Sequence, residues 1–561
     1  MFISTKGKLL LLISLSLLLV TVSNASPTAQ THQGIYVGHQ VRINETSVNV
    51  WYGIPYAQQP IGNLRWMPPQ TLGEANGTKD AYIPNACPQT NAYGIPITEA
   101  CLTLNVYAPD NATNLPVYVW IHGGSFISGA GAEYDAVAFI STTMQHSIPV
   151  VFVTINYRLG LLGFLADKGL YDERSGMNNK STTGNYGVLD QMMALDWIKK
   201  NIRGFGGDAE QITIGGESAG GASVTILLTS SLVTNGTFQR AIIQSGAVWP
   251  NAVSYLQDAI NATGNVLRLL TNCKTLQCLR NLTTEEILTV QYIIGSKSIF
   301  SLAANPVIDN YVIDDTMENN YVKGKFQKVP VLIGANTNES SLFTCPAFNG
   351  SASIIQVQAF FHSSYNATIV DRIPSIYGPI AAANHPLTYL NIVFSNSWLH
   401  CGSRRVASAF SKHGLPSYFY TYNHLIPVAP PCFGVAHAAE LVMLFPTALS
   451  TLFPHYNFTV EEQQFSTSMM IYWANFIRTS NPNYSGNLTT WNAYETSSDN
   501  DFVLDIDSQT RNFYYNGTCS HFWDLYAVTN QYQISSAMKS NQIMNYHMFS
   551  FAGILLIFIS I

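Results

Sequence analysis

Short apolar runs alternate with stretches of helical character along residues 26–535. Apolar runs of about four to eight residues bounded by turn signals are typical of buried strands. They predict strands at 116–121, 149–156, 211–215, 240–244, 329–334 and 416–422. Strands that alternate with helices favour a large, mostly parallel central sheet with helices on both faces, so we expect an α/β fold. No repeat and no Pro/Gly/Ser-rich linker divides the segment, which we interpret as one domain.

A serine stands just beyond one of these strands. The strand at 211–215 is followed by Gly216-Glu217-Ser218-Ala219-Gly220, and residues 221–228 then have helical character. The G-x-S-x-G motif needs its glycines because the serine sits in a sharp turn, where a flanking Cβ would clash with the strand and the helix. In open α/β sheets the ligand crevice lies beyond the carboxyl ends of the strands. We therefore expect Ser218 to present its hydroxyl there as a nucleophile.

The same region carries a family resemblance. Residues 205–221 resemble the serine signature of the type-B carboxylesterase/cholinesterase family, and further matching segments lie at 53–57, 101–106, 156–160, 184–191 and 473–476. The match covers nearly all of the chain after the N-terminal segment. It implies the α/β-hydrolase fold and the hydrolysis of carboxylic esters through an acyl-enzyme on Ser218. No metal or cofactor is implied.

A serine hydroxyl is a poor nucleophile near pH 7, so it needs a base and a carboxylate that orients the base. His437 follows the last predicted strand and a Pro-rich loop, and it is similar to the histidine of the family's G-V-x-H motif. Glu339 follows the strand at 329–334 and matches the family's catalytic glutamate. The other carboxylates considered are less well placed: Asp309, Asp314 and Asp371.

An oxyanion needs backbone N–H donors, one from the residue after the nucleophile and others from a loop after an early strand. Ala219 is the first, and the loop after 116–121 supplies Gly123, Gly124 and Ser125. Family members usually have a third glycine where this chain has Ser125. The backbone donor survives that change, but a Cβ there narrows the crevice and would restrict bulky acids.

Three polar residues near these motifs have less certain roles. Glu217 resembles a family carboxylate near the site, and Ser245 resembles a serine buried behind the acid and the base. A structural role remains open for both. For Arg158 we favour a structural ion pair over contact with substrate.

The segments that would contact the substrate disfavour one class of ester. The resemblance places a tryptophan that holds a quaternary ammonium in the first disulfide loop of cholinesterases, but residues 88–100 contain none, which disfavours choline esters. The acyl-pocket segment 300–304 has little bulk. Two alternatives stay open: a lipase for long-chain or sterol esters, and a catalytically idle adhesion relative. The second is disfavoured because such relatives have lost the nucleophile.

The chain has eight cysteines, and an even number in a secreted protein predicts disulfides. None has the C-x-x-C spacing of a metal site. Sequence alone leaves the pairing open, whereas the resemblance implies Cys87–Cys101, Cys273–Cys278 and Cys401–Cys519, which leaves Cys345–Cys432. That last bridge would tie the loop of Glu339 to the loop of His437.

Both ends of the chain carry targeting signals. Residues 1–25 have two lysines, an apolar run and small residues before Ser26, the pattern of a cleaved signal peptide. At the other end, small residues at 535–537, a polar spacer and the apolar tail 548–561 resemble a glycosylphosphatidylinositol (GPI) signal within residues 536–561. A permanent tail anchor and an apolar end without a targeting role are the alternatives. We expect the secretory pathway, with an extracellular or cell-surface location through a lipid anchor; a vesicle lumen is the alternative.

Charge and glycosylation signals agree with that location. The net charge is −6 at pH 7 and only 11% of residues are charged, so no basic excess exists to bind nucleic acid. The expected partner is a small-molecule ester, and the sequence leaves the oligomeric state open.

N-x-S/T sequons recur along the chain. We expect the one at Asn338 to stay unmodified, because a glycan beside Glu339 would obstruct its packing against His437.

Overall fold

The computed structural model describes residues 26–525 except 44, 249–252, 297–303, 381–384 and 448–455. The predicted signal peptide, the predicted C-terminal spacer and tail, and all but the last residue of the segment 300–304 lie outside the described residues. None of the helices within these described ranges combines the length and the apolar character needed to cross a membrane.

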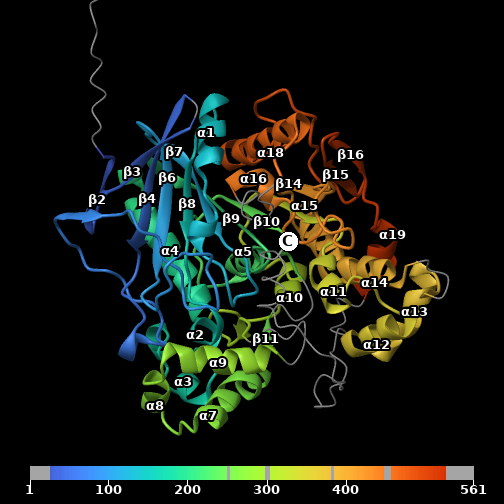
Figure 1. The fold of residues 1–561 in the computed structure, drawn as a ribbon, viewed down its shortest axis with the longest axis horizontal. Coiled ribbons are helices and arrows are strands. Elements are labelled where there is room, and N and C mark those ends of the chain that lie inside the picture. The colour runs from blue at the N-terminus through green and yellow to red at the C-terminus, as the bar shows by residue number, and fades with distance from the viewer. Residues whose placement is uncertain are drawn as a thin grey trace, which may run out of the picture.

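An eleven-stranded sheet runs through the molecule, with helices packed around it (Figure 1). The strands from β8 to β15 are parallel, and antiparallel strands close both edges. In spatial order the strands are β16 (Gln509–Asn512), β15 (Asn500–Leu504), β14 (Ser417–Tyr422), β13 (Val331–Asn336), β10 (Arg240–Gln244), β9 (Gly207–Glu217), β7 (Leu115–Ile121), β8 (Val151–Ile155), β6 (Thr103–Pro109), β4 (Thr46–Pro55) and β3 (His39–Ile43). The six predicted strands are β7, β8, β9, β10, β13 and β14, so this prediction is confirmed.

Two smaller sheets flank the main one. The first contains β1 (Thr28–Thr31), β2 (Gly34–Val37) and β5 (Thr78–Asp80), and the second contains β11 (Ser254–Tyr255) and β12 (Val307–Ile308).

The helices divide between the two faces of the main sheet. Their bounds are α1 (Val137–Gln145), α2 (Gly160–Phe164), α3 (Lys168–Asp172), α4 (Tyr186–Asn201), α5 (Ala219–Thr229), α6 (Leu256–Ala259), α7 (Asn265–Thr271), α8 (Leu276–Arg280), α9 (Thr284–Gly295), α10 (Met317–Val322), α11 (Ser341–Ala347), α12 (Ile354–Ser364), α13 (Ala367–Tyr377), α14 (Pro386–Ser395), α15 (Cys401–Lys412), α16 (Leu441–Leu444), α18 (Val460–Thr479) and α19 (Asn516–Thr518). Short 3-10 or π segments are η1 (Gly62–Leu64), η2 (Gly131–Glu133), η3 (Met177–Asn179), η4 (Ile202–Phe205), η5 (Ile260–Gly264), η7 (Asn396–His400) and η8 (Cys519–Trp523).

Both faces of the sheet are buried, as its parallel strands require. Along β7, Val117, Val119 and Ile121 join the core that includes α4 and α5. Tyr118 and Trp120 join the opposite core, which includes α1 and α18. Strands buried on both faces have continuous apolar sequences. The apolar runs in the sequence therefore predicted the positions of these strands.

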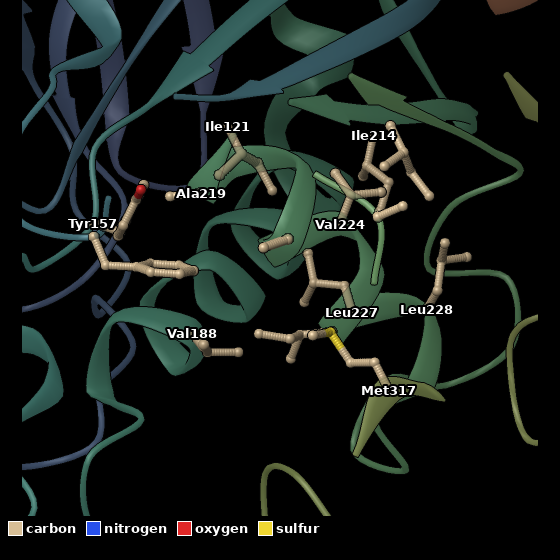
Figure 2. Close-up of a cluster of buried hydrophobic side chains, with 14 of the residues drawn as sticks. Ile121, Tyr157, Val188, Ile214, Ala219, Val224, Leu227, Leu228 and Met317 are labelled. Atoms are coloured by element: carbon tan, nitrogen blue, oxygen red, sulfur yellow. The ribbon is translucent and has the colours of Figure 1, made fainter. Parts of the chain in front are cut away.

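Helix α5 lies against β9 and β10 and is buried along its whole length. Its sequence after the glycines is small or apolar, and Figure 2 shows Val224 and Leu227 of this helix packed among Ile121, Val188 and Met317. A helix that is apolar all round is held by its surroundings on every side. Its N-terminus, where Ser218 stands, is therefore fixed by the core.

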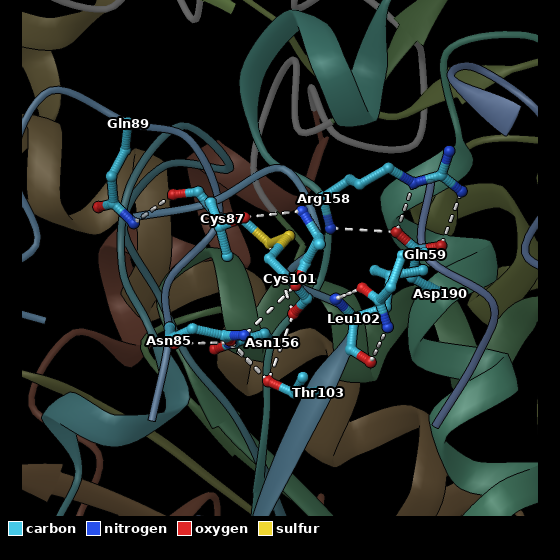
Figure 3. Close-up of a disulfide and its surroundings, with 12 residues drawn as sticks. Gln59, Asn85, Cys87, Gln89, Cys101, Leu102, Thr103, Asn156, Arg158 and Asp190 are labelled. Carbon is cyan, nitrogen blue, oxygen red and sulfur yellow. Dashed lines mark hydrogen bonds and ion pairs between the residues drawn. A yellow bond between two sulfur atoms is a disulfide. The ribbon is translucent and has the colours of Figure 1, made fainter. Parts of the chain in front are cut away.

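Four disulfides join the eight cysteines in the pairs given above, including Cys345–Cys432. Figure 3 shows Cys87–Cys101 beside a network around Asn156, whose amide donates to Asn85. Cys345 lies in α11 and Cys432 in the loop before His437, with Cα atoms 6.0 Å apart.

Candidate active site

Ser218 joins β9 to α5 in a conformation with positive φ, with φ 56° and ψ −122°. The turn is tight: a Cβ on Gly220 would lie 1.9 Å from the Ile121 carbonyl oxygen, and one on Gly216 would lie 2.5 Å from it. The Ser218 N–H donates to the Gln244 carbonyl at 3.0 Å, and its own carbonyl accepts from Ala222 in the first turn of α5. Ser218 is half-buried, so its hydroxyl stands at the partly open end of a fixed turn.

Glu339 and His437 lie side by side, although 98 residues separate them in sequence. His437 Nδ1 is 2.5 Å from Glu339 Oε2. The other carboxylate oxygen accepts from the Ser245 hydroxyl and from the Asn336 N–H, both at 2.6 Å. Glu339 is fully buried, and three donors hold its carboxylate in one orientation.

The second imidazole nitrogen of His437 faces another carboxylate. Its Nε2 is 3.2 Å from Glu217 Oε1, and no hydrogen bond joins it to Ser218 within the part of the chain that the structure describes. Burial lowers the pKa of His437, but the carboxylates of Glu217 and Glu339 outweigh that effect and raise it to about 9. Burial in turn raises the pKa of Glu217 to about 8, and the neighbouring His437 opposes that shift.

Aromatic rings border the imidazole of His437. Trp398 of η7 is stacked on it at 5.5 Å between ring centroids, and Phe343 of α11 lies at 5.6 Å. Trp398 is half-buried. The imidazole is therefore confined between carboxylates on its nitrogens and aromatic rings beside it.

The loop after β7 turns in the left-handed region over three successive residues, with φ values of 100° at Gly124, 55° at Ser125 and 60° at Phe126. Gly123 lies against the nucleophile, since a Cβ there would be 3.1 Å from Ser218 Cβ. Among the described residues, the N–H groups of Gly124, Ser125 and Ala219 donate no hydrogen bond. These unused donors are what a developing oxyanion requires.

The loops of the acid and the base are tied to each other by more than the Cys345–Cys432 bridge. The Asn338 N–H donates to the Val435 carbonyl at 2.8 Å, and the Val435 N–H donates back to Asn338 Oδ1 at 3.0 Å. The Ser341 hydroxyl donates to the Phe433 carbonyl. The Asn338 side chain is therefore part of this contact, and the unmodified state of its sequon stays a prediction.

Arg158 and Asp190 form a buried ion pair, with guanidinium–carboxylate distances of 2.7 and 2.8 Å (Figure 3). This is the structural role favoured above for Arg158. Arg65 pairs with Glu99 in the same bidentate way.

His424 begins the loop that ends at His437. Its Nδ1 is 3.0 Å from Asp505 Oδ1, and its Nε2 is 3.2 Å from Glu462 Oε1. Carboxylates only accept, so both ring nitrogens carry protons when both contacts are made. Burial lowers the pKa of His424, but Asp505 and Glu462 outweigh it and raise the pKa.

Two buried residues of the site were not identified from the sequence. Asn336 ends β13 and Glu440 follows His437 by three residues, and both have no exposed surface. The only local signal for Asn336 is a polar residue at the end of an apolar strand. In the described chain, no group of three or more His, Cys, Asp or Glu side chains could hold a metal ion.

Comparison with known proteins places this site in a family. The family model described as "Carboxylesterase family" matches residues 25–523. The chain belongs to the carboxylesterase family. This membership and the mixed eleven-stranded sheet give the α/β-hydrolase fold, and its activity is that of a serine ester hydrolase.

Similar carboxylesterases include three mammalian proteins. Carboxylesterase 5A of Felis catus is 32% identical over 524 residues, which is 86% of this chain and 91% of that protein. Acylcarnitine hydrolase of Mus musculus is 30% identical over 82% of this chain and 85% of its own. Cocaine esterase of Homo sapiens is 30% identical over 84% of this chain and 87% of its own.

Proposed function

We propose that this carboxylesterase cleaves small carboxylic esters with Ser218 as nucleophile, His437 as general base and Glu339 as the carboxylate that orients it. Ser218 Oγ attacks the ester carbonyl carbon while its proton passes to His437 Nε2. The alcohol leaves with that proton, and an acyl group remains on Ser218. Water then attacks the acyl-enzyme, again giving a proton to His437, and the acid is released as Ser218 regains its hydrogen.

The observation that supports this assignment most strongly is the Glu339–His437 contact at 2.5 Å. This contact lies beside the turn that holds Ser218. The N–H groups of Gly124, Ser125 and Ala219 are assigned to the oxyanion, since they donate to nothing else among the described residues. The role expected for Gly123 stays a prediction, because its backbone is hydrogen-bonded to Tyr134. Donors fixed in advance lower the barrier because they need no reorganisation when charge develops.

The substrate class follows from the absence of a tryptophan in the loop that Cys87–Cys101 closes. We assign esters other than choline esters, and a Ser125 side chain beside the oxyanion donors favours compact acyl groups. Because relatives are named for acylcarnitine and cocaine, both compounds belong in a substrate panel with short- and long-chain acyl esters. Turnover of long-chain or sterol esters alone would favour the lipase alternative.

A fluorophosphonate probe tests the nucleophile. It should label the secreted protein at Ser218, and Ser218→Ala should lose both the label and ester turnover, leaving about 10³–10⁴-fold acceleration over water at most. Ser223→Ala is a matched control, because Ser223 lies one turn along α5 and donates to the Ala219 carbonyl. A folded wild-type protein that takes up no probe would contradict the proposal.

We also propose that the mature protein begins near Ser26 and is held to the cell surface by a GPI anchor near residues 535–537. The disulfides agree with the secretory pathway. Phospholipase C specific for phosphatidylinositol should release active esterase from intact cells, and the released chain should contain no peptide from 548–561. Activity that stays on the membrane, or a soluble product that retains this tail, would exclude the anchor.

A further inference from the structure

Asn336, the last residue of β13, contacts both the acid and the base segments. We propose that it is a positioning residue that sets Glu339 and His437 relative to each other. The inference rests on the roles proposed for those two residues.

The backbone of Asn336 fixes the acid side. Its N–H donates to Glu339 Oε1 at 2.6 Å, so the strand end itself orients the carboxylate. Its carbonyl accepts from His400 Nε2 at 2.6 Å, which ties the strand end to η7. These two bonds do not depend on the side chain at position 336.

The side chain of Asn336 fixes the base side. Its Nδ2 donates to the Ala436 carbonyl at 2.8 Å and to Glu440 Oε2 at 2.6 Å. Ala436 directly precedes His437 and Glu440 follows it by three residues, so one amide group holds the turn on both sides of the imidazole. Gln244 at the end of β10 completes the arrangement by donating to Glu440 Oε1 at 3.1 Å.

The orientation of this amide is set by its acceptors. Nδ2 faces a carbonyl and a carboxylate, whereas Oδ1 is buried and has no hydrogen-bond partner in the part of the chain that the structure describes. An unpaired buried oxygen costs about 1–3 kcal/mol, so stability alone does not favour asparagine here. An aspartate would place a second carboxylate against Glu440, and an apolar side chain would leave the Ala436 carbonyl without this donor.

Loss of the side chain should loosen the base and leave the substrate site intact. Because Nε2 of the base must reach the Ser218 hydroxyl, a displacement of about 1 Å can cost about 10²-fold in rate. We expect Asn336→Ala to lower kcat by about 10- to 100-fold and to leave KM within about twofold.

Asn320→Ala is the matched control. Asn320 on α10 is also buried, donates from Nδ2 to a carboxylate (Asp314, 3.1 Å) and has an Oδ1 without a hydrogen-bond partner among the described residues. Within the same described ranges, no hydrogen bond joins Asn320 to the acid or base loops. Both variants should lose similar thermal stability, but only Asn336→Ala should lose kcat.

A pH profile adds a readout that a purely structural role would not move. Burial raises the pKa of Glu440, and the Asn336 donor opposes that shift. The carboxylates of Glu217, Glu339 and Glu440 together raise the pKa of His437. Without the donor, the pKa of Glu440 rises further, so a smaller share of this carboxylate is ionised and His437 becomes easier to deprotonate. The acid limb of the kcat profile should therefore move to lower pH in Asn336→Ala and stay in place in Asn320→Ala.

A double substitution tests whether Asn336 acts on kcat through the turn that holds His437. If Asn336 acts through the His437 turn, Asn336→Ala with Glu440→Ala should lose less than the product of the two single losses, because the residues share one contact. Wild-type kcat in a folded Asn336→Ala protein, or an unshifted acid limb, would overturn the inference. If wild-type protein takes up no fluorophosphonate, the proposed function fails first, so the two failures are distinguishable.

Discussion

Removal of the Cys345–Cys432 bridge should impair turnover before it impairs folding. The bridge closes a loop between cysteines that are 87 positions apart in sequence. A chain-entropy estimate for such a loop gives about 4.5 kcal/mol of stabilisation, because the bridge restricts the unfolded chain. Neither cysteine lies in the central sheet, so Cys345→Ser/Cys432→Ser should keep its secondary structure at 25 °C. The acid and base loops would then be joined by hydrogen bonds, each worth about 1 kcal/mol, and by the small apolar cluster that Leu342 forms with Phe433 and Ala436.

The assay compares kcat, the fraction of sites labelled by fluorophosphonate and the unfolding temperature. We expect kcat to fall about tenfold through misplacement of His437, and the loss to grow on warming before the sheet unfolds. The control is Cys273→Ser/Cys278→Ser, which removes a bridge between cysteines only 5 positions apart in sequence, near α7 and α8. That bridge stabilises the fold by about 2 kcal/mol, and its removal should leave kcat unchanged. A kcat of the first variant that stays at the wild-type value up to its unfolding temperature would contradict a positioning role for the bridge. Alkylation of both cysteines in native, unreduced protein would refute it as well.

Three further predictions concern single residues. Glu217→Gln removes a carboxylate that raises the pKa of His437, so the acid limb of the pH–rate profile should move to lower pH; an unchanged limb would contradict this electrostatic role. Ser125→Gly relieves a left-handed non-glycine residue and should add about 1 kcal/mol of stability while raising kcat/KM for bulky acyl esters relative to acetate; equal ratios would show that this side chain does not restrict the acyl group. His424→Gln should lower the unfolding temperature most below pH 6.5 and least at high pH, because a histidine with a raised pKa stabilises the fold while protonated and loses that effect as pH rises through its folded pKa. The two flanking carboxylates have lowered pKa values and keep their contribution until the solution is strongly acidic.

The sequence predicted the middle of the sheet well and its edges poorly. Strands such as β10 and β13 are buried on both faces, so their apolar runs stand out from the helices around them. The edge strands β3 and β16 are polar and partly exposed, with no such run to mark them. Antiparallel pairing of β3 with β4 depends on contacts that a local pattern does not contain.

Some parts of the candidate site could be predicted from the sequence and others could not. Ser218, Glu339 and His437 each stand in a short motif after a strand, which made them recognisable. The contact between Glu217 and His437 Nε2 and the bonds of Asn336 join residues far apart in sequence. No spacing rule encodes such pairs, because their proximity is created only when β9, β13 and β14 lie together.

The order of strands in the main sheet follows the order of synthesis almost completely, with only β7 and β8 exchanged. A nascent chain can therefore build the sheet outward from β3 and complete the turn of Ser218 while β13 is still being translated. Until then β10 ends the sheet as an open edge, and open edges invite pairing with other chains. Chaperone protection is most needed during this interval. Hydrolysis cannot begin in it, because the acid and the base belong to the half of the protein that arrives last.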